Sequence, residues 1–296
     1  MTFEEKIKDI IQNYNLGNFL EAESLAKSLL TRNAKDYQLC NIYGLILLKL
    51  NKTEGAVSYF QKSINIKSDF FEAHFNLLQS FYDLKKYDEA ILQSKKCLKI
   101  NSKSIKTFLL LGNLYDKLNQ EKKSEKYFSE ILKIDSKDSN AYYSLGNLYK
   151  KKANYEKAIY NYKLAIKFNE NYFASYNNLG TLYQEIGKFD LAILNFRSTI
   201  KINPNFSGAY QNYLFCLNFS KYFDLNLYFE LVQKFKQSLS KIDLNKISQF
   251  PKIKKIGNKI RIGFVSGDYG NHPVSHYLLN TINHMSDEKF KLIAYS

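Results

Sequence analysis

Histidines that could take part in acid–base chemistry are gathered near the end of the sequence. Three of the four histidines, His272, His276 and His284, lie between residues 259 and 296. His272 follows a turn-rich stretch and precedes Pro273, which suits the first position of a helix. The partial positive charge at a helix N-terminus disfavours an imidazolium, so we expect a neutral His272 that can accept a proton near pH ~7.

The sequence also leaves two other roles for His272 open, helix capping and zinc binding. His272 could simply cap the helix that follows it. The spacing of His272 and His276, four residues apart, also occurs in zinc sites, but Pro273 stands where the metalloprotease motif has its glutamate. The loop has neither a GxGxxG run nor a P-loop lysine. We therefore expect no metal and no bound cofactor.

A column of asparagines could hold a polypeptide backbone. Asn76, Asn178 and Asn212 are separated by whole multiples of 34 residues. An amide side chain both donates to and accepts from a peptide unit, so such a column could grip an extended chain without reading its sequence. Asparagine is abundant here, however, and the same column also holds Ile42, Leu110 and Ser144, so the pattern could arise by composition alone.

The elements expected around His272 are those of a parallel sheet. Residues 259–265 form an apolar, β-branched run that predicts a strand, and residues 290–295 predict a second one. Between them, Val274, Tyr277 and Leu278 mark one side of a helix together with Ile282. His272 would then lie where a strand ends and a helix starts, which is where ligands gather in open α/β sheets.

The elements expected around the asparagine column are helix pairs. Residue types recur every 34 residues over six consecutive units, 3–36, 37–70, 71–104, 105–138, 139–172 and 173–206, without an insertion. The recurring columns include Leu77, Leu111, Leu145 and Leu179; Gly44, Leu78, Gly112, Gly146 and Gly180; Leu47, Phe81, Tyr115, Tyr149 and Tyr183; and Ala22, Ala56, Ala90, Ser124, Ala158 and Ala192.

Each unit predicts two helices that cross at close range. In the fifth unit, Gly146 and Ala158 are the small residues of the crossing, and Tyr149 and Tyr162 fill the space beside it. A short polar turn from Lys151 to Asn154 separates the two helices. Stacked pairs of this kind are expected to form a curved groove lined by the first helices, where a peptide can lie.

The array is expected to end in an atypical unit. Residues 207–240 keep Tyr210 and Leu217 in phase, but Asn226 replaces the small crossing residue, and Phe223, Tyr228 and Phe229 are added. A terminal unit often differs in this way because it covers the last exposed face. We therefore divide the chain into an array at 1–240, a polar linker at 241–258 and a further domain that starts at 259–296.

Composition excludes several classes of protein. The 296 residues carry a formal net charge of +15, almost all of it from lysine, since Arg32, Arg197 and Arg261 are the only arginines. Because so few arginines are present to make bidentate contacts with phosphates and bases, a nucleic-acid partner is not favoured. Cys40, Cys97 and Cys216 sit singly in helical patterns and are expected to be core thiols. The sequence shows no signal peptide and no membrane span, so we expect a cytoplasmic protein.

Two resemblances follow from these motifs. The 34-residue units resemble the tetratricopeptide repeat family. The run from Ile260 to His276, IRIGFVSGDYGNHPVSH, resembles the motif that opens the catalytic domain of protein O-GlcNAc transferases, including the SPINDLY-like members. Together they imply an all-α tetratricopeptide superhelix followed by the first β-α-β unit of an α/β glycosyltransferase domain.

The second resemblance implies a function. That family moves N-acetylglucosamine from UDP-GlcNAc to Ser or Thr of proteins, needs no metal, and has an active-site histidine that corresponds to His272. The asparagines at 76, 178 and 212 resemble its peptide-binding ladder. Because the family has two full α/β lobes and residues 259–296 form only one strand-helix-strand unit, we expect a truncated or incompletely sequenced transferase that is inactive alone. The alternative is a non-catalytic scaffold that binds other proteins.

Overall fold

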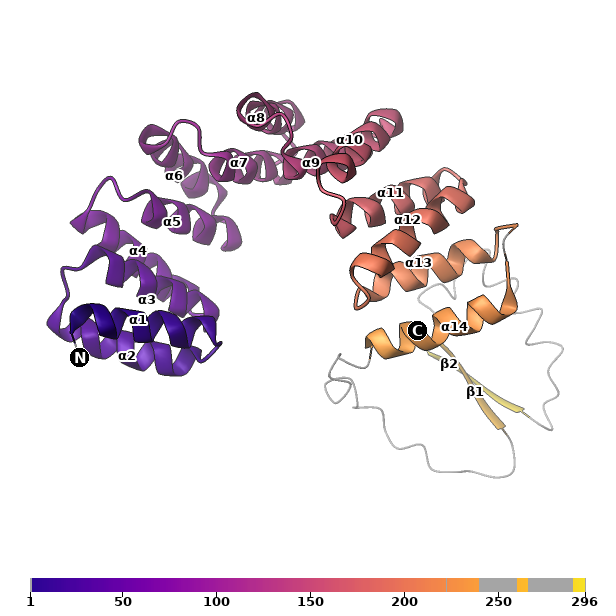
Figure 1. Ribbon diagram of the computed structural model, residues 1–296, viewed down its shortest axis with the longest axis horizontal. Coiled ribbons are helices and arrows are strands. Elements are labelled where there is room, and N and C mark those ends of the chain that lie inside the picture. The colour runs from indigo at the N-terminus through magenta and orange to yellow at the C-terminus, as the bar shows by residue number, and fades with distance from the viewer. Residues whose placement is uncertain (1, 222, 240–259, 266–289, 296) are drawn as a thin grey trace. The chain divides into compact units, whose positions relative to one another are not determined.

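The computed structural model describes residues 2–221, 223–239, 260–265 and 290–295 of the chain (Figure 1). The chain divides into two compact units, Met1–Lys241 and Ile242–Ser296. The described part of the first unit is helical throughout, with the bounds α1 Phe3–Asn15, α2 Phe19–Arg32, α3 Tyr37–Lys49, α4 Thr53–Ile66, α5 Phe71–Asp83, α6 Tyr87–Ile100, α7 Ile105–Lys117, α8 Glu121–Ile134, α9 Ser139–Lys151, α10 Tyr155–Phe168, α11 Phe173–Glu185, α12 Phe189–Ile202, α13 Ser207–Leu217 and α14 Leu225–Leu239.

The helices follow one another as pairs. The odd-numbered helices begin every 34 residues, and we call them the first helices; the even-numbered ones are the second helices. Each second helix contacts the first helix of the next pair, so the pairs stack in chain order (Figure 1). Consecutive first helices also contact one another. The all-α array predicted from the 34-residue period is confirmed.

In the second, fourth, fifth and sixth pairs, the close crossing of the two helices depends on a glycine. A β-carbon added to Gly146 in α9 would lie 2.6 Å from ring carbons Cδ1 and Cε1 of Tyr162 in α10. Tyr162 and Ala158 are both fully buried. The prediction that Gly146, Ala158 and Tyr162 form the crossing is therefore confirmed. Three other glycines face an aromatic ring in the same way: Gly44 meets Phe60, Gly112 meets Phe128, and Gly180 meets Phe196.

A left-handed residue ends every first helix of the six regular units. The residues with positive φ are Gly17, Asn51, Lys85, Asn119, Ala153 and Gly187, at 34-residue intervals. In the fifth unit the N–H of Asn154 donates to the carbonyl of Tyr149 at 2.9 Å, the bond that closes a Schellman-type helix end. The turn therefore reverses the chain over only three residues between α9 and α10.

The seventh pair departs from this pattern. Its first helix, α13, ends at Leu217 after 11 residues, whereas the six earlier first helices have 13. The second helix, α14, then begins at Leu225, two residues later than the phase of the array requires. Asn226 is exposed rather than at a crossing. Tyr210 and Leu217 are buried, as their phase predicted.

The cysteines lie in the core of the array. Cys40, Cys97 and Cys216 are all buried and free. Burial raises the pKa of Cys97 to about 12 and that of Cys216 to about 11, because the apolar surroundings disfavour a thiolate. These thiols are inert packing groups, as the sequence predicted.

Two strands are described in the second unit. Strand β1, Ile260–Val265, pairs in parallel with β2, Phe290–Tyr295, with Ile260 opposite Phe290 and Val265 opposite Tyr295. The helix expected between them lies outside the described residues, so the complete β-α-β unit stays a prediction. Among the described helices, none is long and apolar enough to cross a membrane.

Candidate functional site

The residues singled out in the sequence lie in two different parts of the chain. His272, His276 and His284 are outside the described residues, and their arrangement stays a prediction. Asn76, Asn178 and Asn212 lie on α5, α11 and α13, each half-buried on a first helix. We call the surface formed by neighbouring first helices the first-helix face.

Asn178 belongs to a group of polar side chains that joins two neighbouring units. Its Nδ2 donates to Oδ1 of Asn147 at 2.8 Å and to the hydroxyl of Tyr143 at 3.2 Å. The hydroxyl of Tyr162 donates to the same Asn147 oxygen at 2.8 Å. Asn177 donates from Nδ2 to Oδ1 of Asn178 at 3.3 Å. We call Tyr143, Asn147, Tyr162, Asn177 and Asn178 the amide cluster.

One acceptor of the amide cluster is unpaired. Oδ1 of Asn177 is buried and has no hydrogen-bond partner within the described residues. A buried acceptor without a donor costs roughly 1–3 kcal/mol, so such groups in folded proteins usually meet water or a ligand. After rotation of this side chain, a backbone N–H of a bound polypeptide could supply the missing donor.

The two other predicted asparagines have different surroundings. Nδ2 of Asn76 donates to Oδ1 of Asn41 on α3 at 2.9 Å, which again links neighbouring first helices. The side chain of Asn212, on α13, makes no hydrogen bond to any other described residue. The column is therefore not a continuous ladder, and its three members have three different environments.

Tyr162 is the neutral hydroxyl donor of the amide cluster. Burial raises the pKa of Tyr162 far above its ordinary range, and the nearby Tyr143 adds to the rise. Burial also raises the pKa of Tyr172, whose ring lies 5.1 Å from that of Tyr143, to about 12. The cluster therefore offers uncharged hydroxyl and amide groups, which match a peptide unit better than they match an ion.

Ion pairs fix the first helices beside the cluster. Nζ of Lys150 on α9 lies 2.7 Å from Glu185 on α11, and Nζ of Lys151 lies 3.0 Å from Asp116 on α7. Lys151 also donates to Oδ1 of Asn119 at 2.8 Å. Single exposed pairs of this kind contribute little stability, so we assign them the role of setting the register between neighbouring units.

Asn147 was not among the residues predicted from the sequence. The signal was present, because Gln79, Asn113 and Asn147 form a second polar column at 34-residue spacing, followed by Thr181. The contact between Asn147 and Asn178 could not be read from periodicity, since it depends on the angle between two neighbouring pairs.

The remaining histidine has a structural role. His74 is buried, and its Nε2 lies 2.9 Å from the carbonyl oxygen of Ser68. A carbonyl can only accept, so Nε2 carries the proton, and Nδ1 accepts from Nε2 of Gln93 at 2.7 Å. Nε2 thus ties α5 to the turn that precedes it, and Nδ1 ties α5 to α6.

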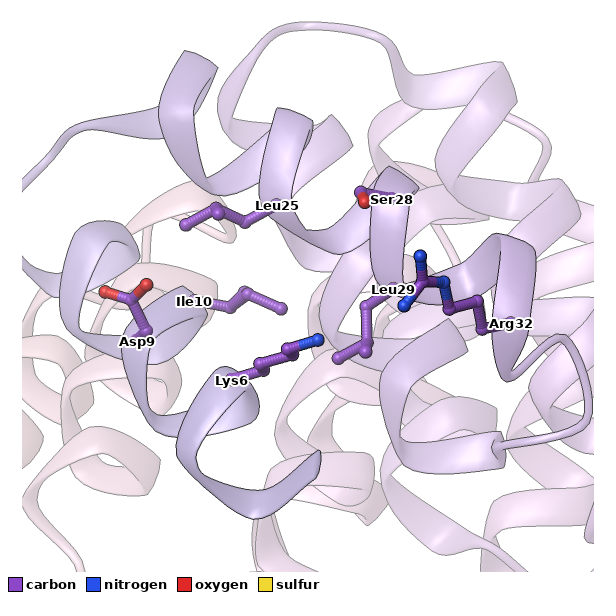
Figure 2. Close-up of a pocket in the computed structure, with 7 residues that line it drawn as sticks. All are labelled: Lys6, Asp9, Ile10, Leu25, Ser28, Leu29 and Arg32. Carbon is purple, nitrogen blue, oxygen red and sulfur yellow. The ribbon is translucent and has the colours of Figure 1, made fainter. Parts of the chain in front are cut away.

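A small pocket lies in the first pair, away from the asparagine column. It has a volume of about 220 Å³ and is lined by Lys6, Asp9, Ile10, Leu25, Ser28, Leu29 and Arg32 (Figure 2). In Figure 2 the carboxylate of Asp9 points away from the Lys6 and Arg32 side chains. Asp9 takes the phase of Leu145, which packs against Phe128 and Ile131 of the preceding pair.

Comparison with known proteins identifies the repeat. The sequence matches the tetratricopeptide repeat family at residues 37–70, 71–104 and 105–138, and again at 127–160, 148–187 and 173–206. The helix pairs are tetratricopeptide repeats. Residues 234–296 match glycosyl transferase family 41, so the tetratricopeptide array leads into a glycosyltransferase-like segment.

One curated protein is similar to part of the chain. Uncharacterized protein RP472 of Rickettsia prowazekii is 31% identical over 107 residues, which cover 36% of this chain and 32% of that protein. The chain thus spans about a third of the length of the curated relative that it matches.

Two solved structures share the fold of the array. The APC/C hetero-tetramer Cut9–Hcn1 matches with a TM-score of 0.60 at 18% identity, over 80% of this chain and 47% of the other. A tetratricopeptide repeat protein from Parabacteroides merdae matches with a TM-score of 0.58 at 17% identity, over 79% of this chain and 98% of the other. At these identities the likeness concerns the fold alone.

Proposed function

We propose that this chain is the acceptor-binding part of a protein O-GlcNAc transferase, an enzyme that moves N-acetylglucosamine from UDP-GlcNAc to Ser or Thr of other proteins. The observation that carries the proposal is the order of the two matches. A tetratricopeptide array, whose helix pairs suit polypeptide binding, is followed at residues 234–296 by a match to glycosyl transferase family 41. We further propose that the chain is a SPINDLY-like member of this transferase family.

The array would bind the acceptor as an extended segment on the first-helix face. The amide cluster provides neutral donors and acceptors of the kind that pair with backbone N–H and C=O groups. Its unpaired acceptor, Oδ1 of Asn177, is buried, and it supports this assignment because a rotation of that side chain would bring it to the surface, where a bound backbone N–H would satisfy it. Backbone contacts of this kind hold many sequences, as an enzyme with many acceptor proteins requires.

His272 would act at the acceptor hydroxyl. In the transfer step the Ser or Thr oxygen attacks the anomeric carbon of the sugar, and the bond from that carbon to UDP breaks. A neutral imidazole at the start of a helix can orient the hydroxyl and accept its proton as the new bond forms. The departing UDP leaves with the electron pair of the broken bond.

A transfer assay tests the catalytic part of the proposal. The chain, and a version extended by the coding sequence that follows Ser296, are incubated with UDP-GlcNAc and cell proteins, and sugar on protein is detected with a GlcNAc-specific lectin. We expect transfer by the extended version and a loss of at least about 100-fold with His272→Ala. His284→Ala is the matched control, since it removes a histidine of the same segment outside the Asn-His-Pro run. Equal activity of both variants would remove His272 from the mechanism.

A binding assay tests the acceptor-holding part. A fluorescein-labelled dodecapeptide of alanine, serine and threonine is titrated with the full 296-residue chain, and anisotropy is recorded. We expect Asn178→Ala to weaken binding about tenfold, because the amide cluster loses its central member. Asn212→Ala, at the same phase but outside the cluster, is the control and should change binding less than twofold. Equal affinities for the two variants would contradict the role of the cluster.

A second candidate function is a non-catalytic scaffold. The scaffold function is favoured because the first-helix face is formed entirely by the tetratricopeptide array, so that polypeptide binding needs no residue outside the array. The scaffold predicts that the dodecapeptide binds with the same dependence on Asn178 while no version of the protein transfers sugar.

A further inference from the structure

Two exposed aromatic side chains lie at the C-terminal end of the last first helix. Phe215 is in the last turn of α13, and Phe219 is in the turn that follows its end at Leu217; they are 47% and 59% exposed, and their ring centroids lie 5.1 Å apart. The ring of Phe189, at the start of α12, lies 4.9 Å from that of Phe219 and is stacked on it. These three rings form one cluster, which we call the aromatic cluster.

The core does not require these rings. The opposite side of α13 already supplies the buried residues of the seventh pair, namely Ala209, Tyr210, Tyr213, Leu214, Cys216 and Leu217. Phe215 and Phe219 are not among the residues of this core or those packed against it; their ring contacts are with each other and, through Phe219, with Phe189. A contiguous group of exposed aromatic rings is the kind of surface that marks a binding site.

The aromatic cluster continues the first-helix face beyond the amide cluster. Phe215 has the phase of Asn147 and Thr181, and Phe219 has the phase of Lys151 and Glu185. In the two preceding units these phases are polar, so the surface changes from polar to aromatic at α13. Because α11 and α13 are in contact, the first helix that carries Asn177 and Asn178 is next to the one that carries Phe215.

We propose that Phe215, Phe219 and Phe189 form a side-chain site that selects acceptor segments with an apolar residue at a fixed distance from the backbone held by the amide cluster. This inference rests on the proposed acceptor binding. Neighbouring helices pack roughly 8–10 Å apart, and an extended chain advances roughly 3.3–3.6 Å per residue. The selected residue therefore lies about three positions from the residue at the amide cluster. Aromatic and large aliphatic side chains fit, since rings stack and aliphatic groups bury area on them.

A phenylalanine scan tests this site. The parent is the labelled dodecapeptide of alanine, serine and threonine, and twelve derivatives each carry one phenylalanine at successive positions. Anisotropy titrations use the full chain in four forms: unchanged, Phe215→Ser with Phe219→Ser, Phe229→Ser, and Asn178→Ala. Phe229 is the matched control because it is 58% exposed but lies on α14, outside the first-helix face. Circular dichroism melts confirm that each form is folded.

The expected result has two parts. One phenylalanine position, or two adjacent ones, improves the affinity of the unchanged chain about tenfold over the parent. That gain disappears in the Phe215→Ser, Phe219→Ser form and persists in the Phe229→Ser form. In the Asn178→Ala form all peptides weaken together.

Failure of this inference differs from failure of the proposed function. If peptides bind and depend on Asn178, but phenylalanine brings no gain or a gain that survives loss of Phe215 and Phe219, the aromatic site is wrong and acceptor binding stands. If phenylalanine peptides bind through Phe215 and Phe219 with no effect of Asn178→Ala, the site stands and the amide cluster is wrong. If no peptide binds, both are wrong.

Discussion

At the scale of single residues, the glycine at the helix crossing of the fifth pair has a clear physical reason. Gly146 lies against the ring of Tyr162, which is fully buried and tied to Asn147 by its hydroxyl. The ring cannot move away without breaking that hydrogen bond. Close packing of this kind tolerates little added volume.

We expect Gly146→Ala to destabilise the array by about 1–3 kcal/mol, because the new β-carbon would overlap the Tyr162 ring. Gly55→Ala is the control, since its β-carbon would meet only Cδ1 of Leu47 at 3.4 Å. In α4 the added methyl group should raise stability by about 0.5–1 kcal/mol through a smaller loss of backbone entropy. Urea unfolding of both variants measures the difference, and a loss of stability in both would contradict the overlap.

A tyrosine between two units gives the array a defined pH dependence. The hydroxyl of Tyr149 on α9 donates to Oε1 of Glu125 on α8 at 2.6 Å, and Lys152 lies 3.3 Å from the other oxygen. The hydrogen bond from Tyr149 lowers the pKa of Glu125, and Lys152 adds to this. Burial, together with the Glu125 carboxylate, raises the pKa of Tyr149 to about 12.

The two shifts act at opposite ends of the pH scale. Since the pKa of Glu125 is lowered, its contribution is present above about pH 4.5 and is lost as the pH falls below that. Since the pKa of Tyr149 is raised, its contribution is present below about pH 10 and is lost as the pH rises toward 12.

We therefore expect Tyr149→Phe to cost about 1 kcal/mol at neutral pH and less at both about pH 4 and about pH 10.5. Tyr155→Phe, which removes a hydroxyl that makes no hydrogen bond within the described residues, serves as the control and should cost little at any of these pH values. The measurement is urea unfolding at the three pH values. A constant cost of Tyr149→Phe would show that the hydrogen bond to Glu125 is not formed.

At the scale of the element, the turn within a pair is strained where a residue other than glycine or asparagine takes the left-handed position, as Lys85 and Ala153 do. Ala153 has a φ of 53°, in the left-handed region that costs an alanine roughly 1–2 kcal/mol. At the same phase Gly17 and Gly187 occupy this region without that cost, and Asn51 and Asn119 are residues that tolerate it. The sequence thus carries a turn signal at this phase.

We expect Ala153→Gly to stabilise the array by about 1 kcal/mol, because it relieves the strain without removing a buried group. Gly187→Ala should have the opposite effect in the next unit, although no atom lies within 4 Å of the added carbon. Thermal unfolding of the two variants provides the measurement. If both variants were stabilised, or both destabilised, the left-handed backbone conformation of this turn would not be the cause of the stability changes.

At the scale of the whole molecule, stability should vary along the array. Each interior pair packs between two neighbours in chain order, whereas α1 and α14 lie at the ends of the described array (Figure 1). In repeat proteins stability is a sum of pair and interface contributions, so the ends open first.

Hydrogen exchange should therefore be slowest in the helices from α3 to α12 and faster in α1 and α14. Gly146→Ala should accelerate exchange mainly in α9 and α10 and in the pairs next to them, with a smaller effect in α3 and α4. Hydrogen exchange monitored by mass spectrometry measures the exchange rate of each helix in the unchanged chain and in the Gly146→Ala variant. A uniform acceleration along the chain would mean that the array unfolds as a single cooperative unit.

The sequence by itself determined the all-α array and its repeat. It also determined the crossing of Gly146 with Tyr162 and the burial of the three cysteines. These follow from periodicity, because residues of one phase occupy the same place in every unit of a helical array. The family 41 match over 234–296 agrees with the motif read around His272, while the histidine's role stays a prediction.

Only the tertiary structure decided which asparagines act together. Asn76, Asn178 and Asn212 share a phase, yet Asn178 is bonded to Asn147, Asn76 to Asn41, and Asn212 to no other described residue. Hydrogen bonds between units depend on how neighbouring pairs are rotated against each other, and on which side chain the facing helix presents at that point. Periodicity fixes the phase of a residue within its unit, but packing between units fixes its partner.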